Sequence, residues 1–461
     1  MKTKTYHFKG LLQNTGWLEN VRVTVDHKGK LTEITSGVSI EGEDMVLDGF
    51  AIPGFQNAHS HAFQYAMAGL AEVHKGSKNP DDFWGWREAM YKLALGMDPE
   101  QMEAIATMVY AEMARHGYTN VAEFHYVHHD KNGKEYDSLA EMGKRLIAAA
   151  QTAGIGITLI PIFYQKGGFG QQPNDRQKRF ISSTVDDYLK LLDASTSACA
   201  FYDEANVAVG IHSMRGVEPS DISLVASTFP QDLPFHIHVS EQLKEIDDSV
   251  AYLGKRPVEW LLDNVEVNER FHLVHATHLT EEETVGLARS KANVVLCPST
   301  EGNLGDGIFP LRKYQDEEGK WSIGTDSHVG INPLEELRIL DYGQRVTTHK
   351  RNSFFSPKQG DSGMFALEMA TSAGRRAMNN HSEEFFAKGN SFNASILNAK
   401  TPLIASSSPE NLTNTIVYTS DPSMQLATIS HGDIVVRDSK HIYGDEIDAK
   451  FVEVIKQLKI R

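Results

Sequence analysis

Histidines and one aspartate stand where short apolar segments of the chain end. His59 and His61 follow the first of these segments, His238 and His275 end two later ones, and Asp326 follows the last. Because side chains alternate along a strand, His59 and His61 point the same way and can share one metal ion. Imidazole and carboxylate ligands make Zn²⁺ the first choice, with Fe²⁺ or Mn²⁺ as alternatives. The pattern predicts a metal site.

The strength of this signal lies in the set and not in any one pair. Two histidines can share a strand by chance, so a single His-x-His pair says little. The residues converge only if the strand ends meet at one mouth, as the carboxyl ends of strands do in a (β/α)8 barrel. The two cysteines, Cys199 and Cys297, support no disulfide framework.

The order of predicted elements favours such a barrel. Helix-like stretches separate most of the strands, and Glu100–Arg115 carries its apolar side chains on one face. Thr280 and Glu283 have the spacing of a helix capping box. A doubly wound open sheet is the competing fold. The eight predicted strands are Phe50–Phe55, Thr119–Phe124, Ile155–Ile162, Asn206–Ile211, Pro234–Val239, Phe271–Val274, Ala292–Leu296 and Trp321–Gly324.

Both ends of the chain have β character. The first fifty residues alternate and turn like short strands, and in the tail we predict strands at Asn414–Tyr418 and Asp433–Arg437 with a turn at Ser430–Asp433. The tail could form a β-domain of its own, or both ends could build one small β-domain. We assign 1–50 to the N-terminal part of that domain, 51–375 to the catalytic barrel, and 376–461 to the barrel end and the C-terminal part.

Composition and charge exclude several classes of protein. Hydrophobic residues make up 41% of the 461 residues and charged residues 23%, as in a globular protein. A net charge of −16 argues against nucleic-acid binding. The chain has no apolar run of membrane-spanning length and no secretory start, so we expect a cytoplasmic protein without a membrane partner. A small anionic substrate would need local arginines.

The ligand motifs resemble those of the amidohydrolase superfamily, over essentially the whole chain. The matching residues are the segment Pro53–His61, the fifth-strand His238, the sixth-strand His275 and the eighth-strand Asp326. The resemblance implies a metal-bearing (β/α)8 barrel with a β-sandwich built from both termini. It also implies that His59, His61, His238 and Asp326 hold one metal ion.

The resemblance also implies a branch and catalytic roles. Binuclear members carry a carboxylated lysine at the end of strand four, but this chain has Gly210–Arg215 there, with no lysine. That favours the mononuclear, deaminase-like branch, which keeps a glutamate three residues after the strand-five histidine. The resemblance then assigns acceptance of the water proton to Asp326, orientation or deprotonation of the metal-activated water to His275, and the proton shuttle to Glu241.

Within this branch, longer segments are similar to a group that acts on formimino-substituted amino acids. They include 59–64, 83–91, 123–129, 212–215, 256–262 and 301–310. The resemblance implies release of ammonia from N-formimino-L-glutamate in histidine breakdown. The implied substrate-binding residues are Gln64, Arg87, Tyr126, His212 and Arg215. The chemical reason for two arginines is their bidentate fit to carboxylates.

Other functions stay open at this point. N-formimino-L-aspartate would use the same groups, whereas a purine-like ring would not need two arginines. A non-catalytic barrel scaffold would be expected to lose ligands or the acid. Arg87 could instead form a surface ion pair with Glu88 or Asp82. We expect the loop Phe83–Trp86 to cap the pocket or form a dimer contact, a homodimer being the family-level expectation.

Overall fold

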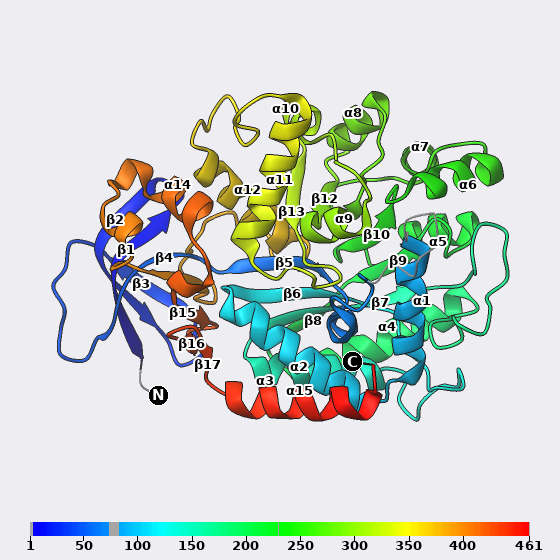
Figure 1. Cartoon of the computed structure of the whole chain (residues 1–461), viewed down its shortest axis with the longest axis horizontal. Helices are drawn as coiled ribbons and strands as arrows, with labels where there is room; N and C mark the ends of the chain where they lie inside the picture. Colours follow the sequence, from blue (N-terminus) through cyan, green and yellow to red (C-terminus); the bar gives the residue numbers. More distant parts are fainter. Residues whose placement is uncertain (1–2, 73–82, 229, 461) are drawn as a thin grey trace.

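The structure, a computed structural model, describes residues 3–72, 83–228 and 230–460. Within these ranges the chain builds a parallel barrel and a separate sheet made from both chain ends (Figure 1). The sheet and the barrel lie side by side. This is the architecture that the sequence predicts. No helix in the described part of the chain has the length and apolar character that a membrane crossing requires.

The barrel strands follow one another in space in the order of the chain, and every neighbouring pair is parallel. A parallel bridge between Ser60 and Asp326 joins the last strand to the first. The strands are β5 (Phe55–Ser60), β6 (Tyr118–His125), β7 (Gly156–Phe163), β9 (Val209–Ser213), β10 (Phe235–Val239), β11 (Phe271–His275), β12 (Asn293–Leu296) and β13 (Lys320–Ile323), with short β8 (Ala205–Val207) beside β7.

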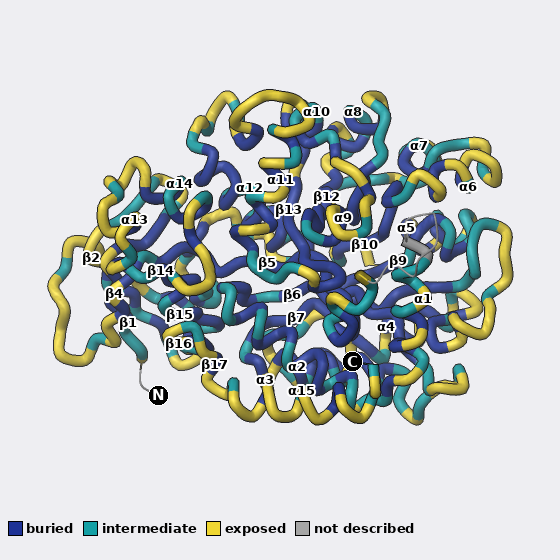
Figure 2. The backbone as a smooth tube through the Cα atoms, in the orientation of Figure 1, coloured by how far each residue is buried: buried dark blue, intermediate teal, exposed yellow. Residues whose placement is uncertain are grey.

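Helices surround this barrel, and their outer faces are exposed while the strands are buried (Figure 2). The predicted capping box opens α8, where the Thr280 side chain accepts from the Glu283 N–H. The helices are α1 (Phe83–Gly96), α2 (Pro99–Arg115), α3 (Glu141–Ala153), α4 (Val185–Cys199), α5 (Pro219–Thr228), α6 (Leu243–Leu253), α7 (Pro257–Asn264), α8 (Glu281–Arg289), α9 (Pro298–Leu304), α10 (Leu311–Asp316), α11 (Pro333–Thr348) and α12 (Ser362–Arg376), with the 3-10 turn η1 (Ala62–Met67).

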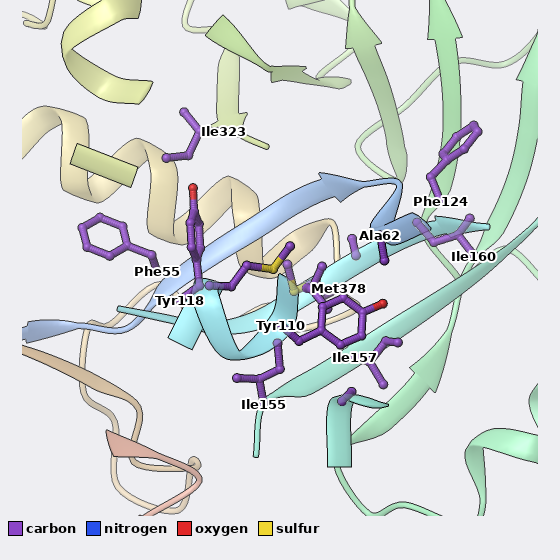
Figure 3. Close-up of a cluster of buried hydrophobic side chains, with 14 of the residues drawn as sticks. Phe55, Ala62, Tyr110, Tyr118, Phe124, Ile155, Ile157, Ile160, Ile323 and Met378 are labelled. Carbon is purple, nitrogen blue, oxygen red and sulfur yellow. The ribbon is translucent and has the colours of Figure 1, made fainter. Parts of the chain in front are cut away.

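A cluster of buried apolar side chains fixes the helices to the strands (Figure 3). Tyr110 of α2 lies beside Ile157 of β7 in this cluster, which also includes Phe124 of β6, and all three are at most 2% exposed. The face of α2 that the sequence marks as apolar is therefore the face that packs on the barrel. Burying a side chain of this size stabilises the fold by roughly 1.5–3 kcal/mol.

The second sheet joins residues from the two ends of the chain. The pairing of β4 with β14 links its N-terminal and C-terminal halves. Its strands are β1 (Lys4–Gln13), β2 (Gly16–Val25), β3 (Leu31–Thr35), β4 (Met45–Pro53), β14 (Ala394–Asn398), β15 (Gln425–Ser430), β16 (Asp433–Arg437) and β17 (Lys440–His441). The C-terminal region also contains α13 (Pro402–Ala405), α14 (Pro409–Thr419), the 3-10 turn η2 (Pro422–Met424) and α15 (Gly444–Leu458).

Three predicted strands differ from the structure. The tail strand Asn414–Tyr418 is wrong: it lies in helix α14, which has Pro409 in its first turn and buries Leu412 and Ile416, four residues apart, on one face. Its β-branched residues favour a strand locally, but packing of that face decides the outcome. The other two are interrupted: Phe50–Phe55 is divided at Gly54 between β4 and β5, and Asn206–Ile211 between β8 and β9.

Gly54 marks the point where the chain leaves the second sheet for the barrel. Its N–H donates to the Asn393 carbonyl at 2.9 Å, whereas the Phe55 N–H donates to Gly117 at 2.9 Å. A Cβ atom at Gly54 would lie 2.5 Å from the Thr119 methyl group. The residue before β5 therefore has to be a glycine for the two sheets to approach each other.

Two turns from opposite ends of the chain touch at Gly29. Its φ is +73°, and an added Cβ would lie 1.7 Å from the His431 carbonyl oxygen. Gly37 offers a matched control, because its φ is +68° with no atom near an added Cβ. We expect Gly37→Ala to lower the free energy of unfolding by about 1–2 kcal/mol through its backbone alone. Gly29→Ala should lose about 1–3 kcal/mol more through overpacking. Equal losses in denaturant unfolding would contradict the close approach.

Candidate active site

The four predicted metal ligands meet at the carboxyl ends of three barrel strands. His59 lies in β5 and His61 directly follows it, His238 lies in β10, and Asp326 lies three residues after β13. The Nε2 atoms of His59 and His238 are 3.1 Å apart. Asp326 Oδ1 lies 3.4 Å from His61 Nε2 and 3.6 Å from His59 Nε2. Side chains 267 residues apart in the sequence thus present their donor atoms to one point.

These distances fit ligation of one divalent ion by the four side chains. Ligand atoms at 2.0–2.1 Å from zinc in a tetrahedron are about 3.3–3.4 Å apart. The measured separations of 3.1–3.6 Å lie around this value. The donor set of three imidazoles and a carboxylate also suits a divalent ion of zinc type.

Hydrogen bonds from behind orient two of the rings. His61 Nδ1 donates to the Phe124 carbonyl at 2.8 Å, and His238 Nδ1 donates to the His212 carbonyl at 2.9 Å. A nitrogen that donates to a carbonyl carries the ring proton, so Nε2 keeps the lone pair that a metal needs. Both rings are therefore held in the tautomer of a ligand.

Burial keeps the histidines neutral. It lowers the pKa of His59 to about 3, lowers that of His61, and lowers that of His238 well below the usual range. Burial alone would raise the pKa of Asp326, but His59, His61 and His275 outweigh it and lower that pKa. Neutral imidazoles beside an ionised carboxylate are the protonation states in which these residues bind metal.

A ring of carboxylates surrounds His275 next to this ligand set. His275 Nε2 lies 3.7 Å from both Glu241 Oε1 and Asp326 Oδ2, and its Nδ1 lies 3.3 Å from Glu301 Oε1. Burial would lower the pKa of His275, but Glu241, Glu301 and Asp326 outweigh it and raise the pKa to about 10. The same negative field favours a bound cation at the neighbouring ligand set.

The backbone at this mouth is strained. Ser240, His275 and Asp326 all have left-handed φ values, of +53°, +68° and +47°. Non-glycine residues adopt this conformation at a cost of about 1–3 kcal/mol and keep it when their surroundings force it. Two of these three residues, His275 and Asp326, line the pocket at the barrel mouth, so the strain occurs where the predicted site lies.

One pocket contains all five of the predicted substrate-binding side chains. Gln64 donates to the Tyr126 hydroxyl at 2.9 Å, and the ring of His212 lies against that of Tyr164 with centroids 4.1 Å apart. The side chains that line the pocket are His61, Gln64, Trp86, Arg87, Met90, Tyr91, Tyr126, Tyr164, Phe180, His212, Arg215, His238, Glu241, His275, Leu304 and Asp326.

The two arginines reach this pocket from different elements. Arg215 follows β9, and its Nη2 lies 3.7 Å from Glu241 Oε2. Arg87 of α1 lies over the Tyr91 ring at 5.2 Å and approaches the Tyr164 hydroxyl at 3.5 Å. Glu88, considered as an ion-pair partner of Arg87, contacts Arg176. Asp82, the other candidate, lies outside the described residues.

The aromatic segment Phe83–Trp86 is not a loop. It forms the first turn of α1, and Trp86 from this turn lines the pocket. The side chains of Phe83 and Trp84 lie outside the described residues. A capping role is thus supported for Trp86, while a dimer contact stays a prediction.

Other histidines lie near the mouth but bond elsewhere. His128 Nε2 contacts the Ile162 carbonyl at 3.1 Å, and His328 contacts the side chains of Thr325 and Ser60 at 2.9 and 3.3 Å. A second group, His275 with Cys297 and Asp326, also has metal-ligand spacing. Burial raises the pKa of Cys297 well above its usual range, so this thiol is protonated and a poor ligand.

Glu301 and Tyr164 are among the residues of the site that were not predicted from the sequence. Glu301 contacts His275, and Tyr164 lines the pocket between Arg87 and His212. Tyr164 directly follows β7, so the search of strand ends that found the ligands could have found it too. Glu301 lies in the first turn of α9 and carries no comparable signal, since its approach to His275 depends on how α9 packs.

Comparison with known proteins places the chain among hydrolases of one type. The profile described as the amidohydrolase family matches residues 50–435. A formimidoylglutamate deiminase from Pseudomonas aeruginosa is 42% identical over 448 residues, which is 96% of this chain and 97% of the relative. A 5-methylthioadenosine/S-adenosylhomocysteine deaminase from Pyrococcus furiosus is 24% identical over 438 residues, 90% of this chain and 91% of the relative.

Solved structures have the same fold. The crystal structure of an amidohydrolase from Brucella melitensis matches with a TM-score of 0.93 and 38% identity, covering 99% of this chain and 100% of that one. An adenosine deaminase from Xanthomonas campestris with bound zinc matches with a TM-score of 0.80 and 18% identity, covering 99% and 98%. The second likeness concerns the fold alone.

The ligand geometry predicts a metal-dependent rise in melting temperature. A metal ion that binds only the folded state at a hundredfold excess over Kd stabilises it by about 2.7 kcal/mol. Zinc added to chelator-treated protein should therefore raise the Tm by a few degrees. Asp326→Ala should abolish this rise, because it removes the only carboxylate in the predicted set of four ligands.

Cys297→Ser provides the control for this measurement. Its thiol belongs to the second ligand-like group, so this variant should keep the full rise in Tm. Loss of the rise in Cys297→Ser would place the ion at the second group, because that group shares Asp326 with the predicted ligands but is the one that contains Cys297.

Proposed function

Because the chain belongs to the amidohydrolase family, we propose that it hydrolyses N-formimino-L-glutamate to N-formyl-L-glutamate and ammonia. The observation that carries the proposal is the 3.7 Å contact between Arg215 and Glu241. This contact places Arg215, which can bind a substrate carboxylate, next to Glu241, which can transfer a proton. The 42% identity to a formimidoylglutamate deiminase over nearly the whole chain supports the same substrate.

His59, His61, His238 and Asp326 are the residues that would hold one divalent ion, which we propose to be zinc. When bound, this ion would supply a Lewis acid that lowers the pKa of water toward about 7 and so makes hydroxide available near neutral pH. With three neutral histidines and one ionised carboxylate, half of the ion's positive charge would stay uncompensated by its ligands.

The reaction HN=CH–NH–R + H₂O → O=CH–NH–R + NH₃ requires both protons of water to move to the leaving nitrogen. Asp326 accepts a proton of the attacking water, and His275 orients or helps to deprotonate that water. Glu241 shuttles the protons to the nitrogen that leaves as ammonia. The position of His275 Nε2, 3.7 Å from both carboxylates, supports this division of roles.

The substrate carries two carboxylates, and the pocket offers two guanidinium groups. Arg215 binds one carboxylate close to the shuttle, and Arg87 binds the other from α1. Gln64, Tyr126 and His212 supply hydrogen bonds between these arginines and the reacting end. Their positions in one pocket support the assignment. Each charged hydrogen bond contributes roughly 1.5–3 kcal/mol to binding.

A deaminase of a neutral aromatic ring is the weaker reading. Two arginines in the pocket have no counter-charge on such a substrate, and desolvating them would oppose its binding. N-formimino-L-aspartate carries the same groups on a shorter chain and is the direct competitor. A homodimer, cytoplasmic location and a place in histidine breakdown stay predictions.

The first experiment is ammonia release by the zinc-loaded protein, with the product identified by mass. We expect a kcat/KM of about 10⁴ M⁻¹s⁻¹ or above with N-formimino-L-glutamate. The formimino-aspartate analogue should be slower, since it has one methylene less to reach both arginines. A reversed preference would shift the assignment to the shorter substrate. Inactivity on both, with metal bound, would refute the proposal.

Glu241→Gln tests the proton shuttle. The amide keeps the shape of the side chain but cannot deliver a proton, so kcat should fall by about 10²–10⁴-fold. Metal content should stay at the wild-type level, because Glu241 is not among the four ligands. A normal kcat in this variant would exclude Glu241 as the proton shuttle. If the variant has lost its metal, the fall in kcat would have to be attributed to the missing metal and not to proton transfer.

A further inference from the structure

Glu245, in the first turn of α6, makes three contacts with residues of the site through one carboxylate. Its Oε1 accepts from the Ser240 N–H at 3.3 Å, and its Oε2 accepts from the Glu241 N–H at 3.1 Å. The same Oε2 lies 3.3 Å from Arg215 Nη1. The Glu245 side chain is 1% exposed and does not line the pocket, so it acts on the site from behind.

The first two contacts stabilise the turn that carries the shuttle. Ser240 has a φ of +53° and is fully buried. Its carbonyl accepts from the His278 N–H at 3.0 Å. The Glu245 carboxylate therefore offsets the strain of a left-handed serine and fixes the direction in which Glu241 leaves β10.

The third contact holds the carboxylate-binding group. Glu245 fixes one nitrogen of Arg215, while the other terminal nitrogen faces Glu241 at 3.7 Å. Arg215 Nε is buried and has no hydrogen-bond partner among the described residues. Arg215 thus lies between a carboxylate that holds it from behind and a pocket in which its remaining donors are available.

We propose that Glu245 is a positioning residue that couples the substrate-carboxylate site to the proton shuttle, an inference that rests on the proposed function. One buried carboxylate fixes both the Arg215 guanidinium and the Ser240–Glu241 turn. A change at Glu245 therefore displaces the binding group and the shuttle together. Substitution of a residue with a purely structural role would change neither KM nor kcat.

The kinetic consequence is a joint change in KM and kcat. Glu245→Gln removes the negative charge beside Arg215 and presents NH₂ donors where Arg215 and two backbone N–H groups already donate. We expect KM for N-formimino-L-glutamate to rise, and kcat to fall, each by about tenfold or more. Glu245→Asp keeps the charge on a shorter side chain and should recover part of both losses.

A double-mutant cycle with Arg215→Met separates the two effects. If Glu245 acts on substrate binding through Arg215, adding Glu245→Gln to Arg215→Met should leave KM unchanged. The same addition should still lower kcat, because the contacts with the Ser240 and Glu241 N–H groups remain. An equal KM increase in both backgrounds would overturn the coupling.

Glu283 offers a matched control in another part of the barrel. This buried glutamate also accepts from two backbone N–H groups, those of Thr280 and Glu259, at 2.8 and 3.2 Å. It likewise pairs with an arginine, Arg256, at 2.8 Å, but none of these residues lines the pocket. Glu283→Gln should lower the Tm while leaving kcat and KM at wild-type values.

Metal content and Tm are measured for every variant, and binding of N-formyl-L-glutamate is measured by calorimetry. Weaker product binding by folded, metal-loaded Glu245→Gln supports the inference independently of turnover. Wild-type product affinity, KM and kcat in that variant would overturn it. If Glu245→Gln does not fold, wild-type KM and kcat in Glu245→Asp would overturn it as well. A wild-type protein that neither binds N-formyl-L-glutamate nor releases ammonia would refute the proposed function itself.

Discussion

The seam that closes the barrel is the constraint on which the site depends. The Thr325 and Asp326 N–H groups both donate to the His59 carbonyl at 3.1 Å. The Asn57 side chain strengthens the seam by donating to Thr325 Oγ1 at 2.7 Å and accepting from the Thr325 N–H at 3.1 Å. These bonds join the first strand to the residues after the last one. The same contact places the His59 imidazole beside the Asp326 carboxylate, so the bonds that close the barrel also bring two of the predicted ligands together.

The pocket has a positively charged wall although the protein as a whole is negatively charged. The chain carries a net charge of −16, and carboxylates gather around His275 at the barrel mouth. The proposed divalent ion would compensate part of this local negative charge. Arg87 and Arg215 make the adjoining wall of the pocket positive, which suits the proposed anionic substrate. One pocket thus brings predicted metal ligands and two arginines together.

The same arrangement of contacts around a buried glutamate occurs twice in the barrel. A buried glutamate that accepts backbone N–H groups and pairs with an arginine occurs at Glu283 and again at Glu245. At Glu283 it caps α8 and ties that helix to Arg256. At Glu245 it holds a strained turn and a pocket arginine. The chemistry of the two carboxylates is alike, and only their distance from the reacting groups separates a stabilising residue from one that affects the reaction.

The sequence alone was sufficient for the architecture and for the residues at most strand ends. Period-two and period-3.6 patterns report which face of an element is buried, and the carboxyl ends of parallel strands must share one mouth. The strand-end pattern gathered His59, His61, His238, His275 and Asp326, and the resemblance to the amidohydrolase superfamily named four of them as the ligands of one metal ion. Local pattern failed at Asn414–Tyr418, where β-branched residues lie in α14 because its apolar face packs in the core. Only the tertiary structure revealed Glu245, Glu301 and Tyr164, since their roles depend on contacts between elements distant in sequence, which local periodicity does not encode.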